Sequence, residues 1–495
     1  MLKRTLVANR GEIACRILRA CKEAEIEGIA IHAANDAGSL FTELADIAIQ
    51  LEGEGLAETY LNQNQIIDIA IANDCDSIHP GFGFLSERAD FAQAVIDSGL
   101  IWIGPSPEAI IKMGDKMTAR ITMKAAGVPV IPGVEVDGGL EQVLAVAPSV
   151  GYPLLLKATA GGGGKGMRAV HDEANLESEA KAAMREALNA FGDDRIYVER
   201  LLTGSRHIEI QVLADKYGRT IHLGERECSI QRRHQKVFEE SPSVAIDTEL
   251  REAMGEAACA AARAVDYEGA GTVEFLVTPT GEFFFLEMNT RIQVEHPVTE
   301  MVTGVDLVRE QLRIAGGEEM SCGPLNIRGH AIEVRLYAED PANNFLPAIG
   351  VLKKFIPPTG PGVRLDTGVR QGDPVTPDYD PMLAKLIVWA PSRKEALLRM
   401  GRALDEFVVL GCTTNIRFLR ELCDHPDVVE GWTTTDMIDR LWPNGWNPDL
   451  QSIIGDAGLL IAAACESTNH GKNITMSSGS SESPSPFSQL SRRYP

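Results

Sequence analysis

The sequence lacks a long apolar segment, an excess of positive charge and a paired cysteine pattern. Its purely apolar stretches, such as Leu459 to Cys465, are far shorter than the roughly 18 to 20 residues needed to cross a bilayer. The 47 Lys and Arg against 70 Asp and Glu give a net charge of −23, which repels nucleic acid and anionic lipid. The nine cysteines include no C-x-x-C pair, so we interpret them as reduced core residues, neither disulfides nor zinc ligands.

The amino terminus leaves no room for a targeting segment. A strand-like run begins by Thr5 in MLKRTLVANRGE, where a signal or transit peptide would need an apolar or an Arg- and Ser-rich stretch. We therefore expect a cytoplasmic protein that binds neither nucleic acid nor membrane. A chain of 495 residues, 44% of them hydrophobic, is typical of a globular protein of about three domains.

Alternating strand and helix patterns predict an α/β protein. Residues 1–113 repeat a strand, turn and helix unit, which predicts a parallel sheet. Residues 114–330 carry long strand runs and include a small strand-rich unit over about 131–202, which we interpret as a lid. Residues 331–447 change to short strands with Pro and Gly turns and are expected to form a separate domain. Residues 448–495 form a tail, expected to be disordered from about 466 because nine of its last thirty residues are Ser.

A glycine-rich loop, KATAGGGGKGM over 157–167, follows an apolar strand. Successive glycines let backbone N–H groups approach a phosphate closely, and Lys157 and Lys165 add positive charge. The loop matches neither G-x-x-x-x-G-K-[ST] nor G-x-G-x-x-G, which disfavours P-loop and Rossmann phosphate binding. The alternative is a flexible linker, but linkers seldom lie between a strand and flanking lysines. We favour a lid that binds phosphate.

A hairpin over residues 271–295 carries a row of polar side chains. In an extended chain, alternation would place five of them on one face: Glu287, Asn289, Arg291, Gln293 and Glu295. Glu274, on the partner strand, would lie roughly opposite Glu287. Two carboxylates and an amide oxygen suit Mg²⁺ that shares its shell with phosphate oxygens. The pattern therefore predicts a metal and anion site, and a solvated edge strand is the alternative.

A basic cluster, QRRHQK over 231–236, lies inside this acidic protein. Its cations repel one another unless anions share the site, although a charge run of this kind is also typical of a solvated turn.

His79, His207 and His330 have no ligand partner at i+4 or in a nearby Cys/His set, so we interpret each as a core or hinge histidine.

Taken together, these motifs resemble the biotin carboxylase component of biotin-dependent carboxylases, in the ATP-grasp superfamily. The matching stretches cover residues 1 to about 445 in the family's order: ANRGEIACRILRAC at residue 8, HPGFGFLSE at 79, MGDK at 113, the glycine loop, ERECSIQRRHQKV at 225, EMNTRIQVEHPVTEM at 287 and RGHAIEVRLYAEDP at 328. The resemblance implies a Rossmann-like first domain, an ATP-grasp fold and a barrel-like carboxyl-terminal domain. It also implies carboxylation of biotin by bicarbonate, driven by ATP through carboxyphosphate, as the first half-reaction of an acyl-CoA or related carboxylase.

The resemblance assigns roles to individual positions. Nucleotide-contacting positions are matched by Lys116, Lys157, Gly163, Gly164, Glu199, Arg200, Leu201, Leu202, His207, Gln231, His234, Glu274, Leu276 and Glu287. The ligands of Mg²⁺ or Mn²⁺ are matched by Glu274, Glu287 and Asn289. The bicarbonate cradle is matched by Lys236, Arg291, Gln293 and Val294. Catalytic positions are matched by Lys236, Arg291, Arg335 and the general base Glu295, and the biotin site by Arg335 and Phe82.

The sequence departs from the family pattern in ways that affect its partners. Ala160 replaces a glycine of the loop, and Phe82 stands where Tyr is usual. No A-M-K-M-like biotinylation motif is present, so biotin is expected on a carrier protein or on another segment, with a carboxyltransferase subunit as a further partner. Arg19 and Glu23 match the bacterial dimer interface, whereas Pro361 replaces an aromatic residue there, which leaves a homodimer open.

Two other functions stay open at this point. One is a carboxylate–amine or carbamoyl-phosphate-type ligase of the same superfamily, which RRHQK and NTRIQVEHP argue against. The other is a scaffold that only binds nucleotide, which the intact Glu274, Glu287, Asn289, Glu295 and Arg335 argue against. The acceptor of the complete carboxylase is not encoded in these motifs.

Overall fold

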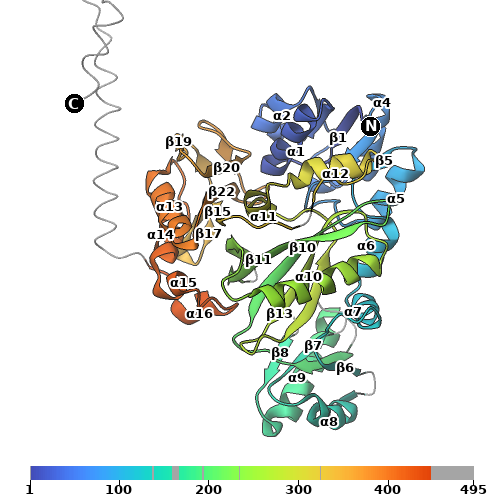
Figure 1. The fold of residues 1–495 in the computed structure, drawn as a ribbon, viewed down its shortest axis with the longest axis vertical. Coiled ribbons are helices and arrows are strands. Elements are labelled where there is room, and N and C mark those ends of the chain that lie inside the picture. The colour runs from blue at the N-terminus through green and yellow to red at the C-terminus, as the bar shows by residue number, and fades with distance from the viewer. Residues whose placement is uncertain are drawn as a thin grey trace, which may run out of the picture. The chain divides into compact units, whose positions relative to one another are not determined.

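The computed structural model describes residues 2–136, 139–158, 167–191, 194–233, 235–323 and 325–447 (Figure 1). Most of the glycine loop, with Ala160, Gly163 and Gly164, lies outside the described residues. The same is true of His234 and of the tail from residue 448 on, including the disorder expected there.

The amino-terminal region is built on a five-stranded sheet in which every pairing is parallel. This confirms the parallel sheet predicted there, and Figure 1 shows it in blue. Its strands in spatial order are β3 (Ile47–Gln50), β2 (Glu27–His32), β1 (Arg4–Val7), β4 (Ser77–His79) and β5 (Ile101–Trp102). The helices that accompany them are α1 (Gly11–Glu23), α2 (Leu40–Leu44), α3 (Gly55–Glu58), α4 (Gln63–Ala72), α5 (Ala89–Asp97) and α6 (Pro107–Gly114). Helix α7 (Lys116–Ala125) follows and shares an apolar core with the largest sheet, described below.

A small antiparallel sheet follows, in the order β6 (Gly133–Val136), β9 (Ile196–Arg200), β7 (Leu154–Ala158) and β8 (Met167–Val170). Two helices that the sequence analysis missed pack on it: α8 (Gly139–Val150) and α9 (Glu173–Phe191). The buried stripe of α9 is largely alanine, with Leu176, Ala180 and Ala183 among its members, and so small an apolar stripe gives a weak periodic signal. The strand-rich interpretation was therefore incomplete.

The largest sheet has eight strands, and every pairing in it is antiparallel. In spatial order they are β14 (Phe283–Asn289), β13 (Gly269–Val277), β10 (Arg206–Ala214), β11 (Thr220–Arg232), β12 (Gln235–Ser241), β15 (His330–Tyr337), β22 (Met382–Ala390) and β20 (Val363–Thr367). Helix α10 (Thr248–Arg263) packs on β10 and β11, α11 (His296–Thr303) on β15, and α12 (Leu307–Ala315) contacts α1. Because β12 pairs with β15, the sheet runs across residue 330, where the sequence suggested a boundary.

The remaining described residues have the short strands that the Pro and Gly turns predicted. They form three small pairs: β16 (Glu339–Asp340) with β17 (Leu346–Pro347), β18 (Gly350–Val351) with β21 (Pro374–Val375), and β19 (Lys354–Ile356) with β23 (Val408–Leu410). Helices α13 (Arg393–Glu406) and α14 (Ile416–Asp424) share an apolar core with β15 and β22, and α15 (Pro426–Glu430) and α16 (Met437–Leu441) follow. The eight cysteines in the described ranges are all free thiols. No helix within those ranges is long and apolar enough to span a membrane.

The hairpin that carries the polar row does not run straight through to Glu295. Glu274 pairs in register with Glu287, as predicted, and a bulge at Leu286 follows from the pairing of Phe275 with Phe285. Strand β14 ends at Asn289, and the chain then turns into α11, which has Glu295 at its N-cap and Pro within its first two residues. The predicted strict alternation is therefore wrong beyond Asn289.

Candidate active site

The ammonium group of Lys236 lies among three carboxylates on the large sheet. Its Nζ atom is 2.6 Å from Glu209 Oε2, 2.9 Å from Glu274 Oε1 and 2.6 Å from Glu295 Oε1. Burial by itself lowers the pKa of Lys236, but the three negative charges outweigh that effect and raise the pKa well above its usual value. Lys236 therefore stays charged and ties β10, β12 and β13 to the start of α11.

Glu274 accepts hydrogen bonds from the strands and the turn around it. Its Oε1 atom accepts hydrogen bonds from Asn289 Nδ2 and Gln293 Nε2, each at 2.7 Å, and its Oε2 atom is 2.8 Å from His207 Nε2. Burial raises the pKa of Glu274, but Lys236 and His207 together hold it well below its usual range. Burial alone would lower the pKa of His207. The negative charge of Glu274 outweighs that effect, so the pKa of His207 is raised above its usual value.

The carboxylates of Glu274 and Glu287 fit a hard divalent cation such as Mg²⁺, because they occupy opposed positions of β13 and β14. The pKa of Glu287 is raised, first by desolvation and then by the negative charge of Glu274, and a cation between the two would relieve that repulsion. Asn289 is close enough to complete the set, but its Oδ1 atom accepts from Arg291 Nη2 at 3.0 Å. Ligation by this oxygen requires the amide to turn over. His207, Glu209 and Glu274 also place ligand atoms within 4.8 Å of one another.

Arg335 joins Glu295 to a further buried carboxylate, Glu239. Its Nε atom donates to Glu239 Oε1 at 2.6 Å and its Nη2 atom to Glu295 Oε2 at 3.0 Å. Burial raises the pKa of Glu295, but Lys236, Arg335 and Arg226 hold it well below its usual value. Burial raises the pKa of Glu239 to about 7, although the Arg335 charge opposes this effect. The pair thus combines one fully ionised carboxylate with one that is partly protonated near neutral pH.

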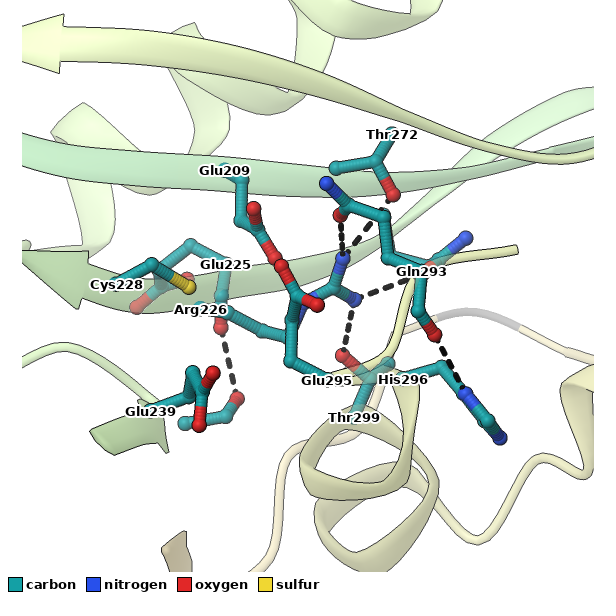
Figure 2. A network of polar contacts seen from close by, with 12 residues as sticks. Glu209, Glu225, Arg226, Cys228, Glu239, Thr272, Gln293, Glu295, His296 and Thr299 are labelled. Carbon is teal, nitrogen blue, oxygen red and sulfur yellow. Dashed lines mark hydrogen bonds and ion pairs between the residues drawn. The ribbon is translucent and has the colours of Figure 1, made fainter. Parts of the chain in front are cut away.

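Arg226 is a buried hub that the sequence analysis did not find. It is fully inaccessible to solvent, and Figure 2 shows its guanidinium at the centre of the network. Besides Glu209, it donates to four groups that lie 2.7 to 3.0 Å away: Gln211 Oε1, Thr272 Oγ1, Gln293 Oε1 and Thr299 Oγ1. It therefore fixes the orientation of Gln293 and Glu209. The alternating polar positions His207, Glu209 and Gln211 on β10 were the available signal for a polar strand face.

Arg291 connects this cluster to the amino-terminal region. Its Nε atom is 3.1 Å from Glu87 Oε2, in the stretch HPGFGFLSE. Asn9 Nδ2 holds that loop by donating to the carbonyls of Pro80 at 2.7 Å and Phe82 at 2.8 Å. Phe82 is half-buried and packs against the apolar cluster around α1.

The basic cluster finds its counter-charges inside the protein. Arg232 Nη2 lies 2.9 Å from Glu339 Oε2, and its guanidinium lies 4.3 Å from the ring centroid of Phe345. Arg233 donates to Asn344 Oδ1 at 2.7 Å. Repulsion within the basic cluster predicted that anions share the site. For Arg232 and Lys236, carboxylates of the protein itself are those anions.

Two of the three histidines are core residues, as expected. His79 is buried, its Nδ1 atom accepts from the Gly81 N–H at 3.0 Å, and burial lowers its pKa to about 3. His330 Nε2 lies 2.7 Å from Glu240 Oε2. His207 differs because it lies in the carboxylate cluster.

Several expected nucleotide positions lie on the small sheet, on the large sheet and at the start of α7. Lys157 forms an ion pair with Glu199 across paired strands. Arg200 and Leu201 donate their backbone N–H groups to the carbonyls of Pro132 and Pro153. The other described positions are Leu202, which follows β9, Lys116 at the start of α7, Gln231 near the end of β11 and Leu276, which pairs with His207 on β10.

Comparison with known proteins gives three successive family matches. They are described as biotin carboxylase, N-terminal domain (residues 1–110), carbamoyl-phosphate synthase L chain, ATP binding domain (115–322) and biotin carboxylase C-terminal domain (333–440). A biotin carboxylase from Nostoc sp. is 50% identical over 439 residues, which is 88% of this chain and 98% of the relative. The chain belongs to the biotin carboxylase family. Biotin carboxylase 1 of Bacillus subtilis is 48% identical over 443 residues, covering 89% of this chain and 98% of that protein.

The family also accounts for the fold of this biotin carboxylase. The biotin carboxylase domain dimer of the 2-oxoglutarate carboxylase of Hydrogenobacter thermophilus was solved with MgADP, ADP and bicarbonate. It superposes with a TM-score of 0.83 at 43% identity, covering 90% of this chain and 98% of that chain. The resemblance and the ATP-grasp architecture inferred from the sequence are confirmed. The carbamoyl-phosphate synthase description applies to the middle match alone, and the two flanking matches are described as biotin carboxylase domains.

Proposed function

We propose that this biotin carboxylase uses ATP to carboxylate biotin, presented on a carrier protein, with bicarbonate through carboxyphosphate. One observation carries the proposal. The Glu295 carboxylate lies between Lys236 at 2.6 Å and Arg335 at 3.0 Å, and Arg291 and Gln293 lie on the same turn. A base placed between two cations suits an anionic substrate on one side and a developing oxyanion on the other.

The first step is the activation of bicarbonate. Lys236, Arg291, Gln293 and the backbone at Val294 would hold the anion, and Glu295 would take its proton as its oxygen attacks the γ-phosphate of ATP. In the free protein Glu295 is a weak base, because the neighbouring cations depress its pKa. An anion that binds Lys236 offsets part of that positive charge, which raises the pKa of Glu295 toward the range of a working base.

We assign the triphosphate of ATP to the neighbourhood of Glu274 and Glu287, the two carboxylates that fit a divalent cation. We assign Mg²⁺ to Glu274, Glu287 and Asn289, and the ion would neutralise phosphate charge during transfer. We assign nucleotide contacts to the matched positions: Lys116, Lys157, Glu199, Arg200, Leu201, Leu202, His207, Gln231, Leu276, and, outside the described residues, Gly163, Gly164 and His234.

The second step transfers the carboxyl group. Carboxyphosphate breaks down to CO₂ and phosphate, the phosphate takes the proton from biotin N1′, and the resulting anion attacks CO₂. Arg335 would donate to the enolate-like ureido oxygen, with Phe82 in the same biotin site. Glu239 holds the Arg335 Nε atom at 2.6 Å and Glu295 accepts from its Nη2 atom at 3.0 Å, which fixes the guanidinium beside the proposed base.

The proposal includes a carrier protein and a carboxyltransferase subunit as partners, a cytoplasmic location, and a division of the chain at residues 113 and 330, with the large sheet continuing across the second boundary. The domain dimer from Hydrogenobacter thermophilus, together with Arg19 and Glu23, supports a homodimer. Pro361 in place of an aromatic residue is the feature to test there, by measuring the oligomeric state of the purified chain.

The experiment is ATP hydrolysis with and without bicarbonate and free biotin. The proposal predicts cleavage that needs Mg²⁺ and bicarbonate and rises on adding biotin. Stimulation by glutamate, glycine or ammonia in place of biotin would favour the carboxylate–amine or carbamoyl-phosphate-type ligase. Nucleotide binding without cleavage would favour the scaffold.

A further inference from the structure

Lys385 is a completely buried lysine to which the proposed reaction gives no role. It lies on β22, where it pairs in register with Arg335 of β15 on one side and with Asp366 of β20 on the other. Its Nζ atom donates to the backbone carbonyl of Val294 at 2.9 Å. The same atom is 3.0 Å from Glu12 Oε1 and 3.8 Å from Asp366 Oδ2.

The charge on Lys385 is maintained by its surroundings. Burial lowers the pKa of Lys385, but Glu12, Glu333 and Asp366 outweigh this and raise it. Outside the ion pair with Lys385, neither carboxylate oxygen of Glu12 has a hydrogen-bond partner among the described residues. A buried ion pair is costly unless its geometry is good, so this arrangement is not explained by a gain in stability.

The bond to Val294 acts on a backbone carbonyl, in a turn that is otherwise held mainly through the side chains of Gln293 and Glu295. Residues 290–295 lie between β14 and α11, where no sheet ladder fixes their carbonyls. Two neighbouring backbone bonds are long, His296 N to Gln293 O at 3.4 Å and Val298 N to Glu295 O at 3.3 Å, and the His296 Nδ1 atom lies 2.7 Å from the Gln293 carbonyl. These contacts act on the carbonyls of Gln293 and Glu295, whereas the Lys385 bond acts on the Val294 carbonyl and sets the plane of the peptide that joins Val294 to Glu295.

The other end of the bridge is fixed as well. Glu12 is the second residue of α1, and the backbone of Gly368 passes close to it. A Cβ atom at Gly368 would lie 2.5 Å from both Glu12 N and Gly11 C, so only glycine allows this approach. Glu12 is therefore held between α1 and the end of β20 and presents its carboxylate to Lys385.

We propose that Lys385 is a positioning residue for bicarbonate. Through the Val294 carbonyl it orients the backbone of the anion cradle and the Glu295 carboxylate, and through Glu12 it makes that orientation depend on the docking of α1. Lys385 contacts no reactant itself. The inference rests on the proposed function, because it assigns bicarbonate to the 291–295 turn.

The test compares Lys385→Met with Lys385→Arg, and uses Arg393→Met as a matched control. Arg393 also joins a buried carboxylate, Glu240, to backbone carbonyls, those of Val428 and Val429, but it has no role in the proposed site. Two quantities are measured on the full chain: the KM values for bicarbonate and ATP, and the rise in melting temperature as bicarbonate is titrated.

Loss of a bond from a charged donor predicts that Lys385→Met needs about ten-fold more bicarbonate in both measurements, with the KM for ATP unchanged. Lys385→Arg should recover most of the bicarbonate affinity, and Arg393→Met should lower the melting temperature alone. Unchanged bicarbonate dependence in a folded Lys385→Met variant, or equal rises in both KM values, would overturn the inference. If Lys385→Met does not fold, Glu12→Gln decides, because it should raise the KM for bicarbonate and spare that for ATP, and no rise overturns the inference.

The two proposals fail differently. If the unaltered chain neither cleaves ATP with bicarbonate nor gains thermal stability from it, the proposed function is wrong and the positioning role falls with it. If the unaltered chain does both and Lys385→Met matches it, only the positioning role is wrong.

Discussion

Replacing Glu295 with Gln should separate catalysis from stability. The substitution keeps the size of the side chain but removes the charge that accepts the bicarbonate proton. Removing a general base typically costs about 10² to 10⁴-fold in rate. We therefore expect kcat for ATP cleavage with bicarbonate and biotin to fall within that range, while the KM for ATP stays nearly unchanged, because Glu295 acts on bicarbonate and not on the nucleotide.

The cost to stability should be modest, because both cations beside Glu295 keep other partners. Lys236 keeps Glu209 at 2.6 Å and Glu274 at 2.9 Å, and Arg335 keeps Glu239 at 2.6 Å. The amide oxygen of Gln can still accept from one of the two cations. The net loss is therefore that of one hydrogen bond to a charged group, about 2 kcal/mol in the free energy of unfolding.

Glu300→Gln provides a matched control for this experiment. Glu300 lies on α11, is buried, and accepts from Arg16 Nη2 at 3.1 Å and Arg364 Nη1 at 2.8 Å. It should lose a similar amount of stability and keep its turnover. Full turnover in the Glu295→Gln variant would show that another base operates, and an equal loss in the Glu300→Gln variant would show that the effect is structural.

Three further changes test the charges around the site. Lys236→Met leaves three carboxylates without their shared cation and should cost about 3 to 5 kcal/mol; an unchanged melting temperature would contradict this. Glu287→Gln should raise the Mg²⁺ concentration needed for ATP cleavage without unfolding the protein, because Glu287 itself is exposed. EDTA should abolish cleavage by both the unaltered chain and the variant, and activity in EDTA would refute the metal assignment. Burial raises the pKa of Glu240, but hydrogen bonds from His330 and Arg393 outweigh this effect and lower the pKa from 4.5 to about 2. The ionised Glu240 therefore contributes roughly 3 kcal/mol to the free energy of unfolding above pH 4.5, and this contribution is lost as the pH falls toward 2. The Glu240→Gln variant should lose stability less steeply between pH 5 and 3, and an equal slope would count against this pair.

Local patterns predicted the parts of the fold that they control directly. The apolar positions of α1 recur at helical spacing and all lie in the core. The long strand runs predicted within residues 114–330 include β10 and β13. The pairing of β12 with β15 could not be predicted, because it joins strands separated by about ninety residues and depends on packing that no local pattern records. The alanine stripe of α9 was missed because its apolar signal is weak.

The site shows the same division. Period-two alternation correctly placed Glu274 opposite Glu287. Arg226 and Lys385 were missed because each is a single charged residue within a strand pattern. Their contacts are made with residues on distant segments, which no local pattern predicts. Glu295 was grouped with Asn289 because an extended chain would place both on one face. In the structure the chain turns after Asn289, and Glu295 reaches the carboxylate cluster around Lys236 from the N-cap of α11.

Transfer of the bicarbonate carbon to biotin can be measured directly with labelled bicarbonate. The purified chain is incubated with MgATP, free biotin and ¹⁴C-bicarbonate, and acid-labile label on biotin is measured together with ADP and phosphate. We predict that label appears on biotin only when MgATP is present, and that Glu295→Gln slows its appearance by about 10² to 10⁴-fold. ATP cleavage without labelled biotin, or label recovered in carbamoyl phosphate when ammonia is added, would contradict it.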